Sequence, residues 1–347
     1  MAPHRSVASN LLQFLGRHVT VPPATPLRRQ QPEEHSAMRN LPFDQPGRFY
    51  RGNLHLHSTN SDGRRSPAET LAGYRAQGYD FVSLTDHFLP KDGVDPVVSN
   101  TVDLRTDDFT ILLGAEIHGP GMECGDLWHI VANGLPLDFA WLGREETGRE
   151  VAARARAAGA FVSIAHPFWS STSITDAESL LDLANSVEVY NHGCEVEVDR
   201  GESWHFTDLL LAKGHHLNAI ATDDAHFSYP GDAERDAYGG WVMVKASSLD
   251  PASLLAALKA GHYYSSTGAD LHHVGIEGDT LHIACSPASV IIVSGEGSRT
   301  ERVVPGPVEA GSVSLAPFQR GGWCRVTIIG IDGSRAWSNP IWLNDPA

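Results

Sequence analysis

The sequence contains no long uninterrupted apolar run: nowhere do about 18 apolar residues follow one another. A transmembrane helix is therefore excluded. Cysteine is scarce, with four in 347 residues, and no two of these form a C-x-x-C pair. This pattern argues against a disulfide-stapled scaffold and predicts reduced, mostly buried thiols in a cytoplasmic protein.

Basic side chains are also few. The chain carries 26 Lys and Arg against 42 Asp and Glu, a formal net charge of −16. A protein that coats nucleic acid needs a basic face, so this balance argues against that class. Hydrophobic residues make up 41% of the chain and charged residues 20%, which supports a packed core. The length suits one large α/β domain plus a small second domain.

Residues 1–40 differ in charge from the remainder. They carry five arginines and two glutamates, a net charge of +3, so the rest of the chain carries −19. Their single short apolar patch, residues 11–15, lacks the length and the cleavage site of a secretory signal. We interpret residues 1–45 as a disordered leader or a mis-assigned start, with Met38 as the true start codon.

Between residues 46 and 261, short apolar runs alternate with amphipathic stretches. Ser66, Pro67 and Glu69 have the order of an N-cap, a first helical position and a capping glutamate, which predicts a helix start. The alternation predicts a mostly parallel sheet, either a barrel or an open doubly wound sheet, with the site at the carboxyl ends of the strands. The expected strands cover residues 53–57, 81–85, 109–115, 127–132, 161–165, 186–190 and 217–221; the other expected helices cover residues 145–158, 176–184, 203–213 and 251–260.

Residues 262–347 differ from residues 46–261 in their sequence pattern. No helical pattern is evident, and β-branched runs at 288–293 and 325–329 are split by Gly, Ser and Asp turns. This pattern predicts a small C-terminal antiparallel β-domain.

Histidines and carboxylates recur at the ends of the expected strands. Neutral imidazoles and ionised carboxylates gathered together would be poorly solvated without cations. Nitrogen and oxygen ligands without a thiolate suit two or three divalent ions, Zn, Mn or Fe. Two such ions sharing one carboxylate would lower the pKa of a bridging water and hold a substrate oxygen. The nine candidate metal ligands are His55, His57, Asp62, His87, Glu116, His129, His166, Asp224 and His226.

Five further residues lie close to these nine in the sequence or the expected fold. We expect the carboxylates of Asp86 and Asp223, which precede candidate ligands, to hold an imidazole in place. His118, His192 and His205 are weaker candidates for a functional role, and the other histidines read as ordinary surface or core residues.

The ordered motifs His55-x-His57, Ser61-Asp62-Gly63, Thr85-Asp86-His87, Gly114-Ala115-Glu116, His129, Ala165-His166-Pro167 and Asp224-x-His226 span roughly residues 50–260. Together they resemble the polymerase-and-histidinol-phosphatase (PHP) metallohydrolase family. The resemblance implies a distorted seven-stranded (β/α) barrel with a di- or trinuclear site, and hydrolysis by a metal-bridging hydroxide. It also implies that Glu116 bridges the ions and that Glu116, Asp224 and His226 take part in catalysis.

Two segments indicate a branch of that family. The opening residues 50–55, YRGNLH, and residues 337–340, WSNP, look like the carbaryl-hydrolase-type (CehA/McbA-like) group. His166 follows His129 by 37 positions, which leaves no room for the helical insertion of the branch that hydrolyses 3′,5′-bisphosphates and short oligonucleotides. The chain is also too short to be a polymerase.

We carry three functional hypotheses. The first is hydrolysis of a small phosphomonoester or phosphodiester, with a ligand-side His or Asp protonating the leaving group. Its substrate contacts would be Arg64, Arg65 and Trp169, with Arg200 and Arg235 as further cations. In the second hypothesis the same ions hydrolyse a carbamate, carboxylic ester or amide. It is motivated by the branch resemblance and by a candidate aromatic pocket of Trp128, Phe168, Trp169, Tyr190 and Trp204. A pocket with few cations near the ions would favour it over the first hypothesis. The third is a non-catalytic binding module, disfavoured because all nine positions are intact.

Overall fold

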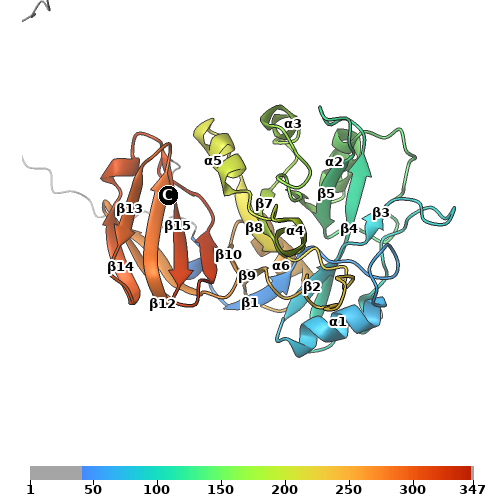
Figure 1. Cartoon of the computed structure of the whole chain (residues 1–347), viewed down its shortest axis with the longest axis horizontal. Coiled ribbons are helices and arrows are strands. Elements are labelled where there is room, and N and C mark those ends of the chain that lie inside the picture. Colours follow the sequence, from blue (N-terminus) through green and yellow to red (C-terminus); the bar gives the residue numbers. More distant parts are fainter. Residues whose placement is uncertain (1–40, 345–347) are drawn as a thin grey trace, which may run out of the picture. The chain divides into compact units, whose positions relative to one another are not determined.

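The computed structural model describes residues 41–344 (Figure 1). The expectations for residues 1–40, including the start at Met38, lie outside this range. Within it, no helix has both the length and the apolar content to cross a membrane. Three cysteines are buried, Cys124 is exposed, and none forms a disulfide in the described part of the chain, as expected.

The described residues form short helices and many strands. The helices are α1 Pro67–Ala76, α2 Gly148–Ala157, α3 Ile174–Glu178, α4 His192–Val198, α5 Trp204–Ala212 and α6 Pro251–Lys259, with 3-10 turns at Pro42–Asp44, Val102–Leu104 and Ala316–Phe318. The first ten strands are β1 Arg48–Asn53, β2 Phe81–Leu84, β3 His87–Phe88, β4 Thr110–Gly119, β5 Trp128–Asn133, β6 Phe161–Ile164, β7 Ser186–Asn191, β8 Asn218–Thr222, β9 Trp241–Ala246 and β10 Tyr263–Ser266. The remaining strands are β11 Leu271–Glu277, β12 Thr280–Gly295, β13 Thr300–Val303, β14 Val308–Ser314, β15 Trp323–Gly330, β16 Arg335–Ser338 and β17 Ile341–Trp342.

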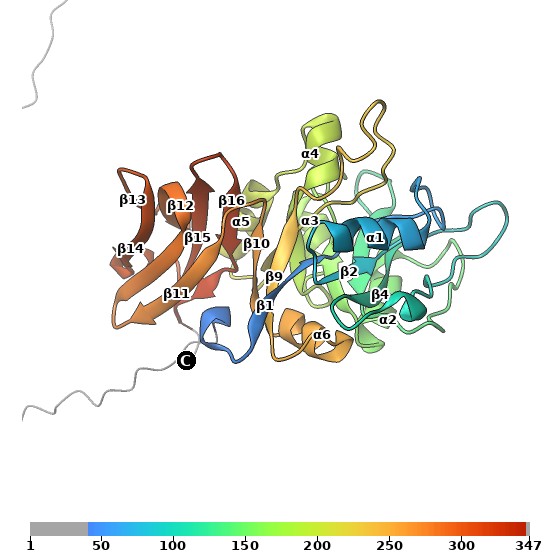
Figure 2. The ribbon, with the colours of Figure 1, turned by 90° about the horizontal axis from the view of Figure 1, so that it is seen from below.

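The predicted start of α1 is confirmed in detail. The Ser66 side chain accepts from the Glu69 amide, and the Glu69 carboxylate accepts from the Ser66 amide at 2.9 Å. Two elements that the sequence patterns did not predict are α4 and β9. The short α4 begins at an Asn191 cap, and β9 pairs antiparallel with β1 and β10 (Figure 2).

The sheet that carries the candidate site is mixed. Strands β1, β2, β3 and β4 pair in parallel, and so do β6, β7 and β8. Strand β5 is antiparallel to both β4 and β6, which departs from an all-parallel sheet. Because β5 runs in the opposite direction, its first residues lie at the edge where β4 and β6 end. His129, the second residue of β5, therefore reaches the same edge as Glu116 and His166.

The expected strand at residues 53–57 is wrong in its bounds. Strand β1 ends at Asn53, whose side chain donates to the Gly240 carbonyl at 2.9 Å and accepts from the His55 amide at 3.0 Å. These bonds turn the chain away from strand pairing, and beyond Asn53 only Leu56 bridges to Ala225. His55 and His57 consequently lie just past the end of β1.

The C-terminal strands pair antiparallel, as expected, and enclose a core of their own. Strand β10 pairs with β9 on one side and with β16 on the other, so hydrogen bonding continues across the boundary predicted at residues 261 and 262 (Figure 2). The mixed α/β class is confirmed. The seven-stranded barrel and the exact domain boundaries stay predictions.

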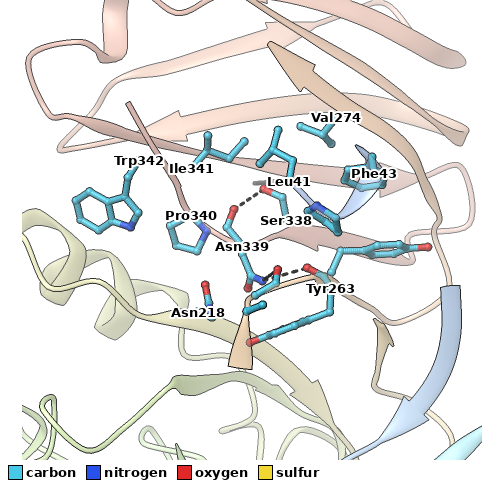
Figure 3. Close-up of a pocket in the computed structure, with 14 residues that line it drawn as sticks. Leu41, Phe43, Asn218, Tyr263, Val274, Ser338, Asn339, Pro340, Ile341 and Trp342 are labelled. Carbon is cyan, nitrogen blue, oxygen red and sulfur yellow. Dashed lines mark hydrogen bonds between the residues drawn. The ribbon is translucent and has the colours of Figure 1, made fainter. Parts of the chain in front are cut away.

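Asn339 ties the two parts together where the C-terminal segment passes the start of β8. Its amide nitrogen donates to the Gly261 and Tyr263 carbonyls at 3.0 Å (Figure 3). Its oxygen accepts from the Ala219 amide at 2.9 Å. A cavity of about 240 Å³ adjoins this residue. That cavity lies at the start of β8, the opposite end from Asp224 and the candidate ligands.

Candidate metal centre

The structure brings all nine candidate ligands together at one edge of the sheet. They come from the chain just past β1, from β3, β4 and β5, and from the segments that follow β6 and β8. Among the described residues, three groups of donor atoms consist only of these nine side chains, and both Glu116 and His57 belong to more than one of the three. Two further groups add Glu188 to His55 and His166, and His118 to His87 and Glu116.

The first group combines two imidazoles with two carboxylates. The Nε2 atoms of His55 and His57 each lie 3.5 Å from Glu116 Oε2. The same two atoms lie 3.2 and 2.9 Å from Asp224 Oδ1. All four side chains are buried or nearly so.

The second and third groups flank the first. In the second, Asp62 Oδ2 is 3.4 Å from His87 Nε2, and Asp62 Oδ1 is 3.3 Å from His226 Nε2. In the third, Glu116 Oε1 is 2.7 Å from His129 Nδ1 and 3.4 Å from His166 Nε2. Glu116 thus presents one oxygen to each of two groups, the arrangement that a bridging carboxylate requires.

These distances fit divalent ions. Ligand atoms placed tetrahedrally about 2.1 Å from an ion lie roughly 3.4 Å apart, and most of the separations above are close to that value. The donor set consists of imidazole nitrogen and carboxylate oxygen, which suits Zn, Mn or Fe. The side chains present are therefore able to hold divalent ions without rearrangement of the fold.

His55 gives an independent sign that a cation belongs there. Its Nδ1 bonds to Glu188 Oε1 at 2.7 Å, so Nδ1 carries a hydrogen and Nε2 is the nitrogen left to meet a cation. That Nε2 is buried, has no hydrogen-bond partner among the described residues, and faces the carboxylates of Glu116 and Asp224. Despite burial, Asp224, Glu188 and Glu116 raise the pKa of His55 well above its usual value, so Nε2 takes up a cation, either a proton or a metal ion.

Glu188 is a functional residue that the sequence reasoning missed. It is fully buried on β7 and accepts from the His166 amide at 2.8 Å and from the Thr222 hydroxyl at 2.8 Å, besides holding His55. The available signal was an acid inside the otherwise apolar run of residues 186–190. A buried acid on a core strand requires partners, and here the partners are candidate ligands.

Asp86 and Asp223 do not hold imidazoles, which corrects the expectation for both. Asp86 accepts from the hydroxyls of Ser58, Ser61 and Ser99, and so organises the loop that carries Asp62. Asp223 accepts from the Tyr74 hydroxyl and from the main-chain amides of residues 238–240. Each carboxylate therefore accepts hydrogen bonds from a segment close to a candidate ligand, and neither bonds to a ligand's imidazole ring.

A cavity of about 270 Å³ opens over the groups. Trp169 lines it, as expected, with its ring centroid 5.0 Å from that of His166. The lining also includes Glu197, Cys194 and Ser228, which the sequence reasoning did not single out, and none of the described residues that line it is Arg or Lys.

The two arginines expected to contact substrate lie elsewhere. Arg65 pairs with Glu234 at 2.8 Å and stacks over Phe227, and Arg64 is exposed; neither lines the cavity. Among the other expected aromatics, Trp128 and Trp204 are buried in the core. Phe168 lines a neighbouring cavity instead, together with Arg200.

The protonation states of the candidate ligands depend on how closely their imidazoles and carboxylates are packed. Burial favours neutral carboxyls, yet the surrounding imidazoles His87, His129 and His118 hold the pKa of Glu116 well below its usual range. Burial, together with His226 and His87 nearby, lowers the pKa of His57 to about 4. Glu116 is thus ionised and His57 neutral at neutral pH, the states that metal coordination requires. Despite burial, the nearby carboxylates raise the pKa of His87 to about 11 and that of His226 to about 9, so these two rings would have to release a proton to bind an ion.

Two candidate ligands have strained backbones. His166 has φ of 23° and Asp224 has φ of 58°, in the left-handed region that residues other than glycine rarely adopt. Each is held by its amide, which donates at 2.8 Å: His166 to Glu188 Oε2 and Asp224 to the His55 carbonyl. Such strain is typical of functional sites, where the surroundings over-determine the conformation.

Comparison with known proteins supports the fold. No family model matches the chain, and no curated protein matches it. Among solved structures, the chain is similar to a two-domain protein from Bacteroides vulgatus that contains a predicted PHP-like metal-dependent phosphoesterase. The match has a TM-score of 0.50 at 14% identity and covers 90% of this chain and 100% of that one.

Two partial matches have lower scores. A putative metal-dependent phosphoesterase from Bifidobacterium adolescentis has a TM-score of 0.36 at 16% identity, covering 50% of this chain and 87% of that one. An amidohydrolase from Chromobacterium violaceum has a TM-score of 0.38 at 16% identity, covering 52% and 88%. The similarity to the Bacteroides vulgatus structure, and not these partial matches, shows that the chain has a PHP-like fold, as the motif resemblance implies. Its branch stays a prediction.

Proposed function

We propose that this protein is a metal-dependent hydrolase of small esters, with phosphomonoesters or phosphodiesters as its first substrate class. The observation that carries the proposal is the convergence of the nine side chains at one edge of the sheet, where His55 Nε2 is buried without a hydrogen-bond partner among the described residues. In this proposal the three groups described above would hold the ions, and Glu116 would serve two of these groups. When bound, such ions activate a water and neutralise developing charge on a substrate oxygen.

The chain's own residues supply orientation and a proton. Glu188 fixes the ring of His55, and Trp169 covers one side of the cavity. Asp224 and His226, expected from the sequence as proton donors, are occupied as ligands in this proposal. Glu197 lines the cavity, and no described residue engages its carboxylate by a hydrogen bond or ion pair. Burial and the nearby Asp236 raise its pKa, so we assign the leaving-group proton to Glu197.

The charge of the cavity links the substrate class to the number of ions. Besides the protonated Glu197, four carboxylates line the cavity or bond to its ligands: Asp62, Glu116, Glu188 and Asp224. Two divalent ions would balance their charge, and three would leave a net charge of +2. An anionic phosphoester is attracted in the second case, so in this proposal phosphoesterase activity is highest with three ions.

A second candidate function is hydrolysis at the carbonyl group of a carbamate, carboxylic ester or amide by the same centre. The absence of Arg and Lys from the described lining favours it, because a neutral substrate needs no cationic clamp. The carbaryl-hydrolase-like branch expected from the sequence belongs to this candidate.

The test is a substrate panel at defined metal loading. The protein is stripped with chelator, reloaded with Mn²⁺ or Zn²⁺, and assayed on p-nitrophenyl phosphate, bis(p-nitrophenyl) phosphate and an aryl N-methylcarbamate. Phosphoester turnover that rises only with the third ion supports the first candidate. Carbamate turnover without phosphoester turnover supports the second. A loaded protein that turns over none of the three contradicts both, and His57→Ala is the inactive control.

A further inference from the structure

His118 stands next to the candidate ligands without belonging to the expected nine. It lies on β4 two residues after Glu116, so the two side chains share one face of the strand. Its side chain is 1% exposed. In the ladder with β5 it lies opposite His129, another candidate ligand.

The hydrogen bonds of His118 determine which of its nitrogens carries the hydrogen. Its Nδ1 lies 3.2 Å from the Trp128 carbonyl, which only accepts, so Nδ1 donates. The neutral ring then offers a lone pair at Nε2. That Nε2 lies 2.9 Å from Nδ1 of His87.

This arrangement fixes the ring of His87 in turn. His87 Nδ1 donates to His118 Nε2, which leaves Nε2 as the nitrogen that can offer its lone pair to an ion. Nε2 is the atom that faces Asp62 at 3.4 Å in the second group. Glu116 Oε2 also lies 2.6 Å from His87 Nδ1, but it is not in hydrogen-bonding geometry and is directed to the first group.

We propose that His118 is a positioning residue that holds His87 with its Nε2 lone pair directed at an ion shared with Asp62 and His226. Two hydrogen bonds thus link β5 to this second group: His118 donates to the Trp128 carbonyl on β5, and His87 donates to His118. The inference rests on the proposed function, because it requires the centre to bind ions. It adds that the second group depends on His118, a residue outside the nine ligands, as the first and third groups depend on Glu188.

The test measures metal binding in the absence of substrate. Chelator-stripped wild type, His118→Ala and His118→Gln are titrated with Co²⁺ and Zn²⁺, and bound metal is counted after gel filtration. Losing a partner that orients a ligand typically weakens metal binding about 10–100-fold. We therefore expect His118→Ala to lose one equivalent at limiting metal and to keep the others. His118→Gln restores that equivalent, because its amide can accept from His87 and donate to Trp128.

Controls separate this inference from the function on which it rests. His192→Gln changes a half-buried histidine that bonds to Tyr190 outside the nine ligands, and it should bind metal as wild type does. Thermal unfolding in chelator shows whether each variant is folded. Equal stoichiometry and affinity in wild type and His118→Ala would overturn the role of His118 alone. A wild type that binds no metal would overturn the proposed function as well, and a His118→Gln protein as defective as the alanine variant would reduce His118 to a packing role.

Discussion

At the scale of single residues, the centre depends on pairs in which one side chain fixes another. Glu188 sets the ring of His55, and the main-chain bonds of His166 and Asp224 hold these two residues in backbone conformations that they would otherwise avoid. Such partners matter because a ligand nitrogen must present its lone pair in one direction. Glu197 differs from all of these, since no described side chain holds its carboxylate.

The role assigned to Glu197 predicts a dependence on the leaving group. Replacing Glu197 with Gln removes the proton but keeps the shape. Turnover of an alkyl ester, whose alkoxide needs a proton to leave, should fall about 10²–10⁴-fold. Turnover of the p-nitrophenyl ester should change little, because its phenolate leaves unprotonated. Steady-state rates on the two esters check this.

Equal losses on both esters would show that Glu197 acts in some other way than by giving a proton. Glu195→Gln is the matched control, because Glu195 lies on the same helix and accepts from the Gly201 amide away from the cavity. We expect it to leave the ratio of the two rates unchanged.

At the scale of elements, short side-chain contacts hold strands and helices in register around the centre. Strand β8, which leads into Asp224, is tied to β10 through Asn339 as well as through the Ser265 hydroxyl, which donates to the Ala219 carbonyl at 2.9 Å. Helix α6 packs against β9 from outside, and its start is fixed by the Asp250 cap. Both features lie away from the candidate ligands, so their loss should affect stability before it affects chemistry.

Asn339→Ala should lower the free energy of unfolding by about 2–3 kcal/mol, because it leaves a buried amide and two carbonyls without partners. Urea unfolding followed by tryptophan fluorescence measures this. The exposed Asn344→Ala serves as the control and should match wild type. If Asn339→Ala unfolds at the same urea concentration as wild type, Asn339 does not tie β8 to β10.

Asp250 makes α6 sensitive to acid. Its carboxylate accepts from the amides of Ala252 and Ser253, and hydrogen bonds from Ser248 and Ser253 lower its pKa to about 2. Because the folded pKa lies below the unfolded value of about 3.9, this stabilisation is full above pH 4 and is lost as the pH falls towards 2. Asp250→Ala should cost about 1 kcal/mol at neutral pH, with a deficit that shrinks in acid.

Urea midpoints at neutral pH and across the acid range check this prediction. Asp250→Asn keeps the cap without the charge, so its difference from Asp250→Ala should stay constant with pH. A deficit of Asp250→Ala that is independent of pH would contradict the part assigned to the charge.

At the scale of the whole molecule, the sequence predicted the candidate ligands better than the elements that carry them. Most of the nine residues could be found because they close or open a run with a clear apolar pattern, whereas Asp62 lies in a polar turn and rested on the ordered family motifs. Glu188 was missed and His118 was only a weaker candidate, because no local pattern shows which ligand from another strand such a side chain meets. Strand β9 was missed because its partners β1 and β10 are distant in sequence.

The strand expected at residues 53–57 was wrong for a related reason. Its apolar alternation suits a strand, but the Asn53 side chain bonds to Gly240, almost 190 residues away, and ends the pairing. Long-range bonds of this kind decide where a strand stops, and they leave no mark in the local sequence. The position of Arg65 depends on a distant residue in the same way, since its guanidinium pairs with Glu234 and does not line the cavity.

The central claim is that this edge of the sheet holds divalent ions, and anomalous diffraction tests it most directly. Crystals grown with Mn²⁺ or Zn²⁺ should show two or three anomalous peaks. The first peak is expected among His55, His57, Glu116 and Asp224, and the second among Glu116, His129 and His166. A third would lie among Asp62, His87 and His226. Well-ordered side chains with no anomalous peak between them would contradict the account.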